Sequence, residues 1–233
     1  MRKTLAKAAL LCAMAVSLAA CGSPKTSEAP ADTSAAGSEA AGAAQQTPAG
    51  SKIVRVAAVD PQVALDPQQH TYSIVMKITD NVSEALLKTT KDGSLEPVLL
   101  AKMPEISEDQ LTYSFELLPD VKFHNGETLK ASDVKYSYER LIKLAKMATL
   151  LENVEGYDAL SNGEAEELSG VEVQDDTHFT IKLVKPYAPF LSVLSTAYTA
   201  IYPEAACEEA GDTWGMQVLY GTGPFKLDSY QTG

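Results

Sequence analysis

The chain has 233 residues, of which 45% are hydrophobic and 21% are charged, and its formal net charge is −12 at pH 7. This composition is ordinary for a soluble globular protein, and the length suffices for one large domain or two small ones. The acidic balance argues against nucleic acid as a partner, because phosphate binding needs a basic face, and against attraction to anionic lipid.

Residues 1–20 have the pattern of an export signal. A basic start with Arg2, Lys3 and Lys7 precedes an apolar stretch over residues 8–17. That stretch of about ten residues is too short to span a bilayer of roughly 30 Å as a helix. We therefore expect residues 1–20 to be a signal peptide.

The sequence LAAC at residues 18–21 resembles the bacterial lipobox, in which the sulfur of the cysteine, here Cys21, receives a diacylglyceryl group. The alternative is a plain secreted protein that has a cysteine at this position. Residues 22–51 are rich in Ala, Ser, Thr, Gly and Pro, and such a segment buries too little apolar surface to become ordered. We expect residues 21–52 to be a lipidated cysteine and a flexible linker. The protein would then be exported and held by its lipid on the cell membrane, facing the periplasm or the outer side.

The folded part is expected to begin near residue 53. Residues 52–60 (KIVRVAAVD) favour a short strand, and residues 64–70 (ALDPQQH) favour a turn. Apolar residues recur at helical spacing from 73 to 87, which predicts an amphipathic helix.

Alternating residues dominate the middle of the chain. Residues 111–117 predict a half-buried strand, and the pattern around Asp175-Asp176 predicts a β-hairpin. Between them, Ser132 is expected to cap a helix that runs to about residue 144.

Towards the end, residues 189–197 favour a helix, and residues 221–227 (GTGPFKL) favour a turn followed by a strand. Helices and strands are mixed without strict alternation, which indicates an α+β or mixed α/β fold.

The sequence contains no pattern that predicts catalysis. His70, His124 and His178 lie far apart without metal-ligand spacing, and His124 and His178 are interpreted as surface or turn residues. No G-x-S-x-G motif or other nucleophile motif is present. Cys207 is the single cysteine expected in the mature domain, so it is interpreted as structural and without a disulfide partner. We expect no catalytic residue, no metal site and no cofactor, and hence a protein that is not an enzyme.

Three stretches carry a more specific signal. Residues 95–141 contain, in order, T-Y-x-F-x-L, V-K-F-H-x-G and A-x-D-V-x-Y-S, and residues 171–194 continue with a hairpin and a Pro-aromatic segment. Residues 220–230 follow with YGTGPFKLDSY, and ALDP at 64–67 fits the same order. Together they resemble the extracytoplasmic solute-binding proteins of ABC importers, in the oligopeptide, dipeptide and nickel-binding family 5.

The resemblance implies a two-lobed, mixed α/β fold of the periplasmic-binding-protein type. Residues 53–80 would begin the first lobe, residues 81–216 would form the accessory domain, and residues 217–233 would re-enter the first lobe. Members of the family are more than twice this long, so the second lobe is expected to be missing and the chain to be truncated at its C-terminus.

The resemblance also implies a function. The protein would be a monomeric, lipid-anchored substrate-binding protein that captures oligopeptides outside the membrane for import by ABC permease subunits. In peptide binders of the family, the segment after the L-D-P turn lies along the bound peptide. This segment maps to His70, Thr71, Tyr72 and Ser73, whose alternative role is only to start the next helix. The alternative functions are a truncated, non-transporting remnant or partner-binding lipoprotein and, less favoured, an exported hydrolase.

Overall fold

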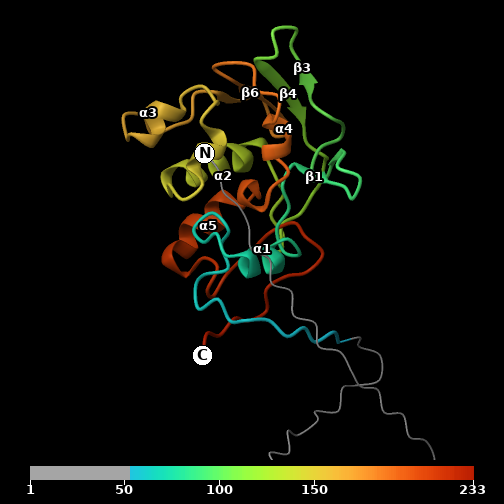
Figure 1. Ribbon diagram of the computed structural model, residues 1–233, viewed down its shortest axis with the longest axis vertical. Coiled ribbons are helices and arrows are strands. Elements are labelled where there is room, and N and C mark those ends of the chain that lie inside the picture. The colour runs from blue at the N-terminus through green and yellow to red at the C-terminus, as the bar shows by residue number, and fades with distance from the viewer. Residues whose placement is uncertain (1–52) are drawn as a thin grey trace, which may run out of the picture. The chain divides into compact units, whose positions relative to one another are not determined.

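An antiparallel sheet and one long helix organise the described part of this computed structural model, residues 53–233 (Figure 1). The expected signal peptide, the lipidated Cys21 and the linker fall in residues 1–52, outside the described residues. Residues from Arg55 onward form one unit. Within the described residues, no helix combines the length and the apolar character needed to cross a bilayer.

The sheet has four antiparallel strands in the order β3-β4-β6-β5. Its strands are β3 (Glu105–Ile106), β4 (Thr112–Glu116), β5 (Val171–Val173) and β6 (His178–Lys182). The alternating pattern buries Phe115 of β4 and Phe179 of β6, which are register partners with stacked rings 4.9 Å apart. The predicted strand at 111–117 and the predicted hairpin around Asp175-Asp176 are thus confirmed.

Helix α2 (Ala131–Lys143) packs against β5 and contributes Val134, Tyr138 and Leu141 to the main core. The expected Ser132 cap is wrong. The helix already begins at Ala131, so Ser132 lies inside it and Lys130 is the capping position. The carboxylate of Asp133 accepts the Lys130 N–H at 2.8 Å, so an acidic residue in the first turn satisfies the free amide.

The remaining elements are short. A second sheet pairs β1 (Leu87–Thr89) with β2 (Leu95–Pro97). The other helices are α1 (Ser73–Thr79), α3 (Tyr157–Ser161), α4 (Phe190–Val193) and α5 (Glu204–Ala210), and the 3₁₀ turns are Ala148–Leu151, Ala197–Thr199 and Gly211–Thr213.

Two predicted helices are shorter than expected because side chains bind the backbone carbonyls at their ends. Helix α1 stops at Thr79, whose hydroxyl donates to the Val75 carbonyl at 3.0 Å, and the Asn81 amide donates to the Lys77 carbonyl at 2.8 Å. After α4, the Ser195 hydroxyl likewise donates to the Ser192 carbonyl at 2.8 Å. The Asn81 and Ser195 bonds occupy carbonyls that backbone N–H groups would use to continue the helix, whereas the Thr79 hydroxyl adds a second donor to a carbonyl inside α1.

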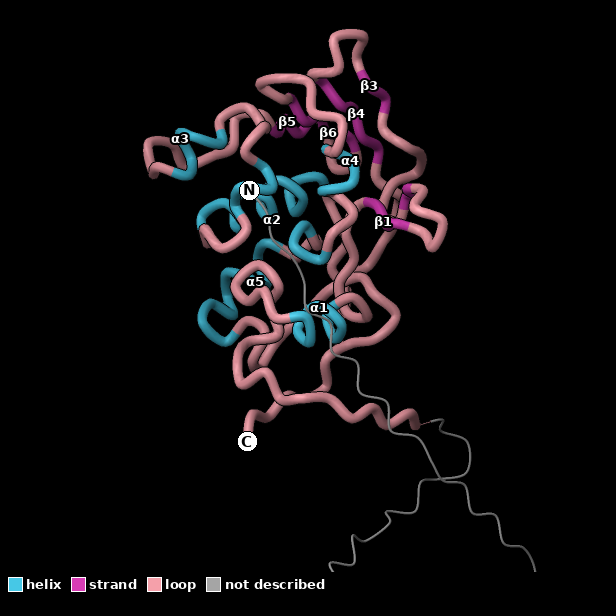
Figure 2. Tube along the Cα trace, in the orientation of Figure 1, coloured by secondary structure: helices cyan, strands magenta, loops and turns pink. Residues whose placement is uncertain are grey.

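The predictions of strands at residues 52–60 and after residue 224 are wrong for the described residues, which are irregular there (Figure 2). A strand needs a neighbour that accepts and donates its backbone hydrogen bonds. No described segment pairs in this way with residues 53–59, and Val56 and Val59 remain 83% and 81% exposed. β-branched composition alone therefore does not produce a strand here.

His124 lies in a turn, as the sequence predicted, and its half-buried side chain also fixes residues 221–223 against the rest of the unit. Its Nε2 lies 2.8 Å from the Gly223 carbonyl, and its Nδ1 accepts the Gly221 N–H at 3.2 Å. The backbone N–H of His124 also donates to the Gly221 carbonyl at 3.0 Å. Because a carbonyl only accepts and an amide N–H only donates, the geometry requires the proton on Nε2.

Replacing His124 with phenylalanine is expected to lower the free energy of unfolding by about 1–2 kcal/mol. The substitution retains a half-buried ring but leaves the Gly221 N–H and the Gly223 carbonyl, both in buried residues, without their partner. His178→Phe is the matched control, because the His178 side chain is half exposed beside Asp175. Urea unfolding of both variants gives the comparison, and equal losses would contradict the role assigned to His124.

Candidate functional site

The predicted solute-contact residues, here called segment 70–73, lead into α1. Tyr72 has extended backbone angles (φ −71°, ψ 132°) and Ser73 is the first residue of the helix. Thr71, Tyr72 and Ser73 are exposed, whereas His70 is half-buried. Tyr72 is the N-cap of α1 and Ser73 is its first residue, so these two residues start the helix, as the alternative expectation has it, whereas His70 and Thr71 precede it.

Segment 70–73 has unused backbone donors. In the described part of the chain, no hydrogen bond involves the N–H groups of Thr71, Tyr72 or Ser73. The Tyr72 carbonyl accepts the Met76 N–H at 3.3 Å, which ties the segment to the first turn of α1. An extended stretch with free amides can accept a second extended chain beside it.

A buried turn at Leu65–Gln68 fixes where this segment starts. The carbonyl of Asp66 accepts the N–H groups of Gln69 and His70 at 3.1 and 2.9 Å. Its carboxylate Oδ1 accepts the Gln68 N–H at 2.9 Å. Asp66 and Gln68 are fully buried, so both side chains require polar partners.

Arg140 of α2 supplies those partners. Its two terminal nitrogens donate to Asp66 Oδ2 and to Gln68 Oε1, each at 2.6 Å. The guanidinium carbon lies 5.8 Å from the centre of the buried Tyr202 ring. Burial by itself lowers the pKa of Arg140, but the Asp66 carboxylate outweighs this effect and raises it. The Arg140–Asp66 pair therefore binds α2 to the turn before segment 70–73.

The amide of Gln68 extends this network. Its Nε2 donates to the carbonyls of Ser137 and Tyr198 at 3.1 and 3.3 Å. Sequence reasoning missed Asp66, Gln68 and Arg140, although a charged residue next to the buried Tyr138–Leu141 stripe of a helix is a usable signal for a buried ion pair.

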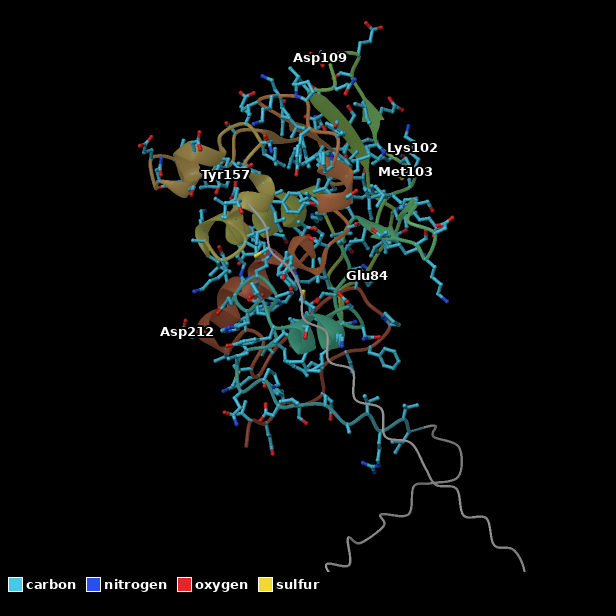
Figure 3. The ribbon with its side chains drawn as sticks, viewed as in Figure 1. Glu84, Lys102, Met103, Asp109, Tyr157 and Asp212 are labelled. Atoms are coloured by element: carbon cyan, nitrogen blue, oxygen red, sulfur yellow. The ribbon has the colours of Figure 1, made fainter. Side chains whose placement is uncertain are left out.

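A polar hollow of about 550 Å³ lies beyond the C-terminal end of α1. Its polar lining comes from three segments that are distant in the sequence, namely Asp80, Ser83 and Glu84, then Lys88 and Thr89, then Ser195 and Thr196. Figure 3 shows Glu84 close to α1, whereas Asp109 lies at the tip of the β3–β4 turn.

Two observations describe the chemistry of the hollow. Burial raises the pKa of Asp80, and the Ser83 hydroxyl is buried without a hydrogen-bond partner in the described residues. The Thr89 and Ser195 hydroxyls lie 2.9 Å apart and bond to each other. The hollow is thus lined by hydroxyl and carboxyl groups, the Lys88 amine and apolar side chains such as Leu87, Pro97 and Val98, and no sequence motif predicted it.

Other polar groups do not assemble into a reactive site. Among the described residues, no group of three or more His, Cys, Asp or Glu side chains is arranged to hold a metal ion. Cys207 is buried and forms no disulfide within residues 53–233, and burial raises the pKa of its thiol, which keeps the thiol unreactive.

Comparisons with known proteins agree on one family. Residues 94–233 match the bacterial extracellular solute-binding proteins, family 5. The dipeptide-binding protein DppE of Bacillus subtilis is 28% identical over 189 residues, covering 78% of this chain and 34% of DppE. The chain thus spans about a third of the length of the curated relatives that it matches.

Solved structures show the same fold. OppA of Listeria monocytogenes bound to peptide superposes with a TM-score of 0.68 at 24% identity, over 72% of this chain and 34% of that one. Haemophilus influenzae OppA in complex with the peptide RPPGFSPFR gives a TM-score of 0.68 at 25% identity, over 74% and 34%. The fold is mixed α/β of the periplasmic-binding-protein type, as the sequence predicted.

Proposed function

Because this chain belongs to family 5 of the bacterial extracellular solute-binding proteins, we propose that it captures oligopeptides outside the membrane for import through an ABC permease. The names of its relatives support a peptide as the solute, since DppE is a dipeptide-binding protein and both OppA structures hold peptides. The family binds solutes rather than converting them, which supports binding over hydrolysis.

Segment 70–73 carries this proposal. Tyr72 has extended backbone angles, residues 71–73 are exposed and have free N–H groups, and the Asp66–Arg140 pair anchors the start of the segment. A peptide that lies alongside such a segment gains main-chain hydrogen bonds irrespective of its side chains, which suits a receptor for many peptides.

The domain boundaries and the anchor complete the proposal. Residues 53–80 and 217–233 would contribute to the first lobe and residues 81–216 would form the accessory domain. The Tyr230 hydroxyl donates to the Asp60 carboxylate at 3.2 Å and to the Val63 carbonyl at 3.0 Å, and these bonds between residues 53–80 and 217–233 support the assignment of both to one lobe. Lipid on Cys21 would hold the receptor at the membrane, and a flexible linker of about 30 residues would reach roughly 30 Å from it.

Two proline substitutions test main-chain pairing directly. Tyr72 already has the φ angle of proline and Ser73 is the first helical residue, so Tyr72→Pro and Ser73→Pro each remove one unused N–H without disturbing the fold. Successive amides of an extended chain point to opposite sides, so only one of the two faces a paired peptide. We expect one variant to weaken peptide affinity about tenfold and the other to change it little.

The measurement is calorimetric titration with a mixed set of tripeptides, with thermal unfolding as the control for folding. Tyr72→Ala separates the loss of the ring from the loss of the amide, because it removes the ring and keeps the N–H. If both proline variants fold and bind peptide like the parent chain, main-chain pairing at this segment is wrong.

A further inference from the structure

The polar hollow beyond the C-terminal end of α1 takes no part in the peptide capture proposed above, and its size suits a small solute. Its volume of about 550 Å³ lies within the range of about 300–1,000 Å³ that is usual for ligand sites in proteins. Segment 70–73 leads into α1, whereas the wall of the hollow begins at Asp80, after the helix has ended. The hollow is therefore a candidate binding site of its own.

Three hydroxyl groups of the wall have already used their protons. The Ser195 hydroxyl donates to the Ser192 carbonyl at 2.8 Å, so the 2.9 Å bond between Thr89 and Ser195 must use the proton of Thr89. The Thr196 hydroxyl donates to the Val193 carbonyl at 2.9 Å. Because a hydroxyl has one proton and two lone pairs, these three oxygens can only accept a further hydrogen bond.

Two carboxyl groups add further acceptors and negative charge. In the described residues, no ion pair involves Asp80 or Glu84. Glu84 is half-buried, and one of its oxygens accepts the Thr222 hydroxyl at 2.8 Å. The protein around Asp80 desolvates its carboxyl and raises the pKa, and no neighbouring cation offsets this effect. The wall thus carries two carboxyl groups whose charge is not balanced.

Donors are scarce in this wall, all of which belongs to the described residues. The Lys88 ammonium lies 3.1 Å from the Glu96 carboxylate, which is not part of the wall, so its charge is already balanced. Ser83 is 6% exposed, and its hydroxyl has no hydrogen-bond partner among the described residues. A buried hydroxyl without a partner is costly, so a polar partner is expected beside it. The side chains of the hollow therefore favour an occupant that is rich in donors and positively charged.

We propose that the hollow binds the primary ammonium group of a small solute, with Asp80 and Glu84 as its counter-charges and three hydroxyl oxygens of the wall as acceptors. An ammonium group carries one positive charge and three N–H donors and accepts no hydrogen bond, so it complements a wall of acceptors. A solute carboxylate would instead face two carboxyl groups, and a neutral polyol would leave their charge unbalanced. This inference does not rest on the proposed function, because the hollow and segment 70–73 share no residue.

The first test compares two probes of equal charge that differ in their donors. 1,4-Diaminobutane has primary ammonium groups, whereas its permethylated counterpart has quaternary ammonium groups and no N–H. Each probe is titrated into the 233-residue chain, and the backbone amide signals of Ser83, Glu84 and Ser195 are followed by NMR. We expect the primary diamine to move these signals and to bind about tenfold more tightly than the quaternary one, since only the primary diamine can donate to the wall.

Two substitutions test the carboxyl groups. Asp80→Asn and Glu84→Gln keep the shape of the side chain and remove its charge, and each should weaken diamine binding about tenfold. Glu172→Gln is the matched control, because it removes the same charge from an exposed position of β5 and should leave the affinity unchanged. Thermal unfolding of the three variants checks that they are folded.

A peptide also carries a primary ammonium group at its N-terminus, and trialanine with a free or an acetylated terminus separates this source from a free amine. If only free trialanine moves the signals of the hollow, and Glu84→Gln abolishes the effect, the occupant is a peptide terminus. The inference is overturned if neither the diamine nor trialanine moves these signals, or if the quaternary probe binds as tightly as the primary one. A loss in Glu172→Gln equal to that in Glu84→Gln would also overturn it.

Discussion

Replacing Arg140 with methionine is expected to lower the free energy of unfolding by about 3–5 kcal/mol, a large share of the 5–15 kcal/mol typical of a folded domain. The substitution removes both donors from Asp66 and Gln68, which are fully buried. An unpaired carboxylate is then left in the interior, and its desolvation dominates the cost. Urea unfolding followed by the fluorescence of Trp214, the single tryptophan, measures the loss.

The matched control is Lys143→Met on the same helix. Lys143 is 52% exposed and pairs with Glu139 only at 3.9 Å, so its removal should cost about 0.5 kcal/mol or less. The double variant Arg140→Met/Asp66→Asn should recover part of the loss, since it removes the buried charge. If Arg140→Met and Lys143→Met destabilise equally, the buried pair is not the anchor of this turn.

Arg140→Met should also loosen the backbone at the start of segment 70–73. The Asp66 carbonyl holds the N–H groups of Gln69 and His70, and Arg140 holds Asp66. Amide hydrogen exchange at residues 69 and 70 is therefore expected to accelerate in Arg140→Met before the sheet strands β4 and β6 lose protection.

Gly221→Ala is expected to destabilise the chain by about 3 kcal/mol or more, because the new methyl group has no space. A Cβ at Gly221 would lie 2.2 Å from the Val82 carbonyl oxygen and 2.6 Å from the Ser83 Cα, and both are backbone atoms. Residues 221–225 would have to move away from the end of α1. The bonds from Gly223 N–H to Val82 and from Phe225 N–H to Asn81, at 2.9 and 3.0 Å, would then break.

Gly163→Ala serves as the comparison for this steric effect. Nothing lies within 4 Å of a Cβ at Gly163, and the only cost is its φ of +73°, about 1 kcal/mol. Thermal unfolding of the two variants separates crowding from backbone conformation. A loss at Gly221 no greater than that at Gly163 would mean that residues 221–225 are not packed against residues 81–83 as described.

Patterns that depend on neighbouring residues were readable from the sequence. The alternation of residues 111–117 predicts β4, and the spacing of Val134, Tyr138 and Leu141 predicts the buried stripe of α2. Both succeed because period 2 and period 3.6 follow from backbone geometry alone. The strand predicted at residues 52–60 is wrong, because a β-branched run forms a strand only beside a pairing partner, and the local pattern does not show whether one is present.

The ordered motifs of residues 95–141 and the L-D-P turn were enough to indicate the family and to place His70, Thr71, Tyr72 and Ser73 as candidates. Their environment was not readable, because Asp66 and Arg140 are 74 residues apart and their pairing depends on how α2 packs. His124 and Gly221 are 97 residues apart and meet for the same reason. The sequence by itself therefore determined the fold class, the family and the segment expected to contact solute. The tertiary structure alone decided which buried charge anchors that segment, because the Asp66–Arg140 pair depends on a contact between residues distant in the chain.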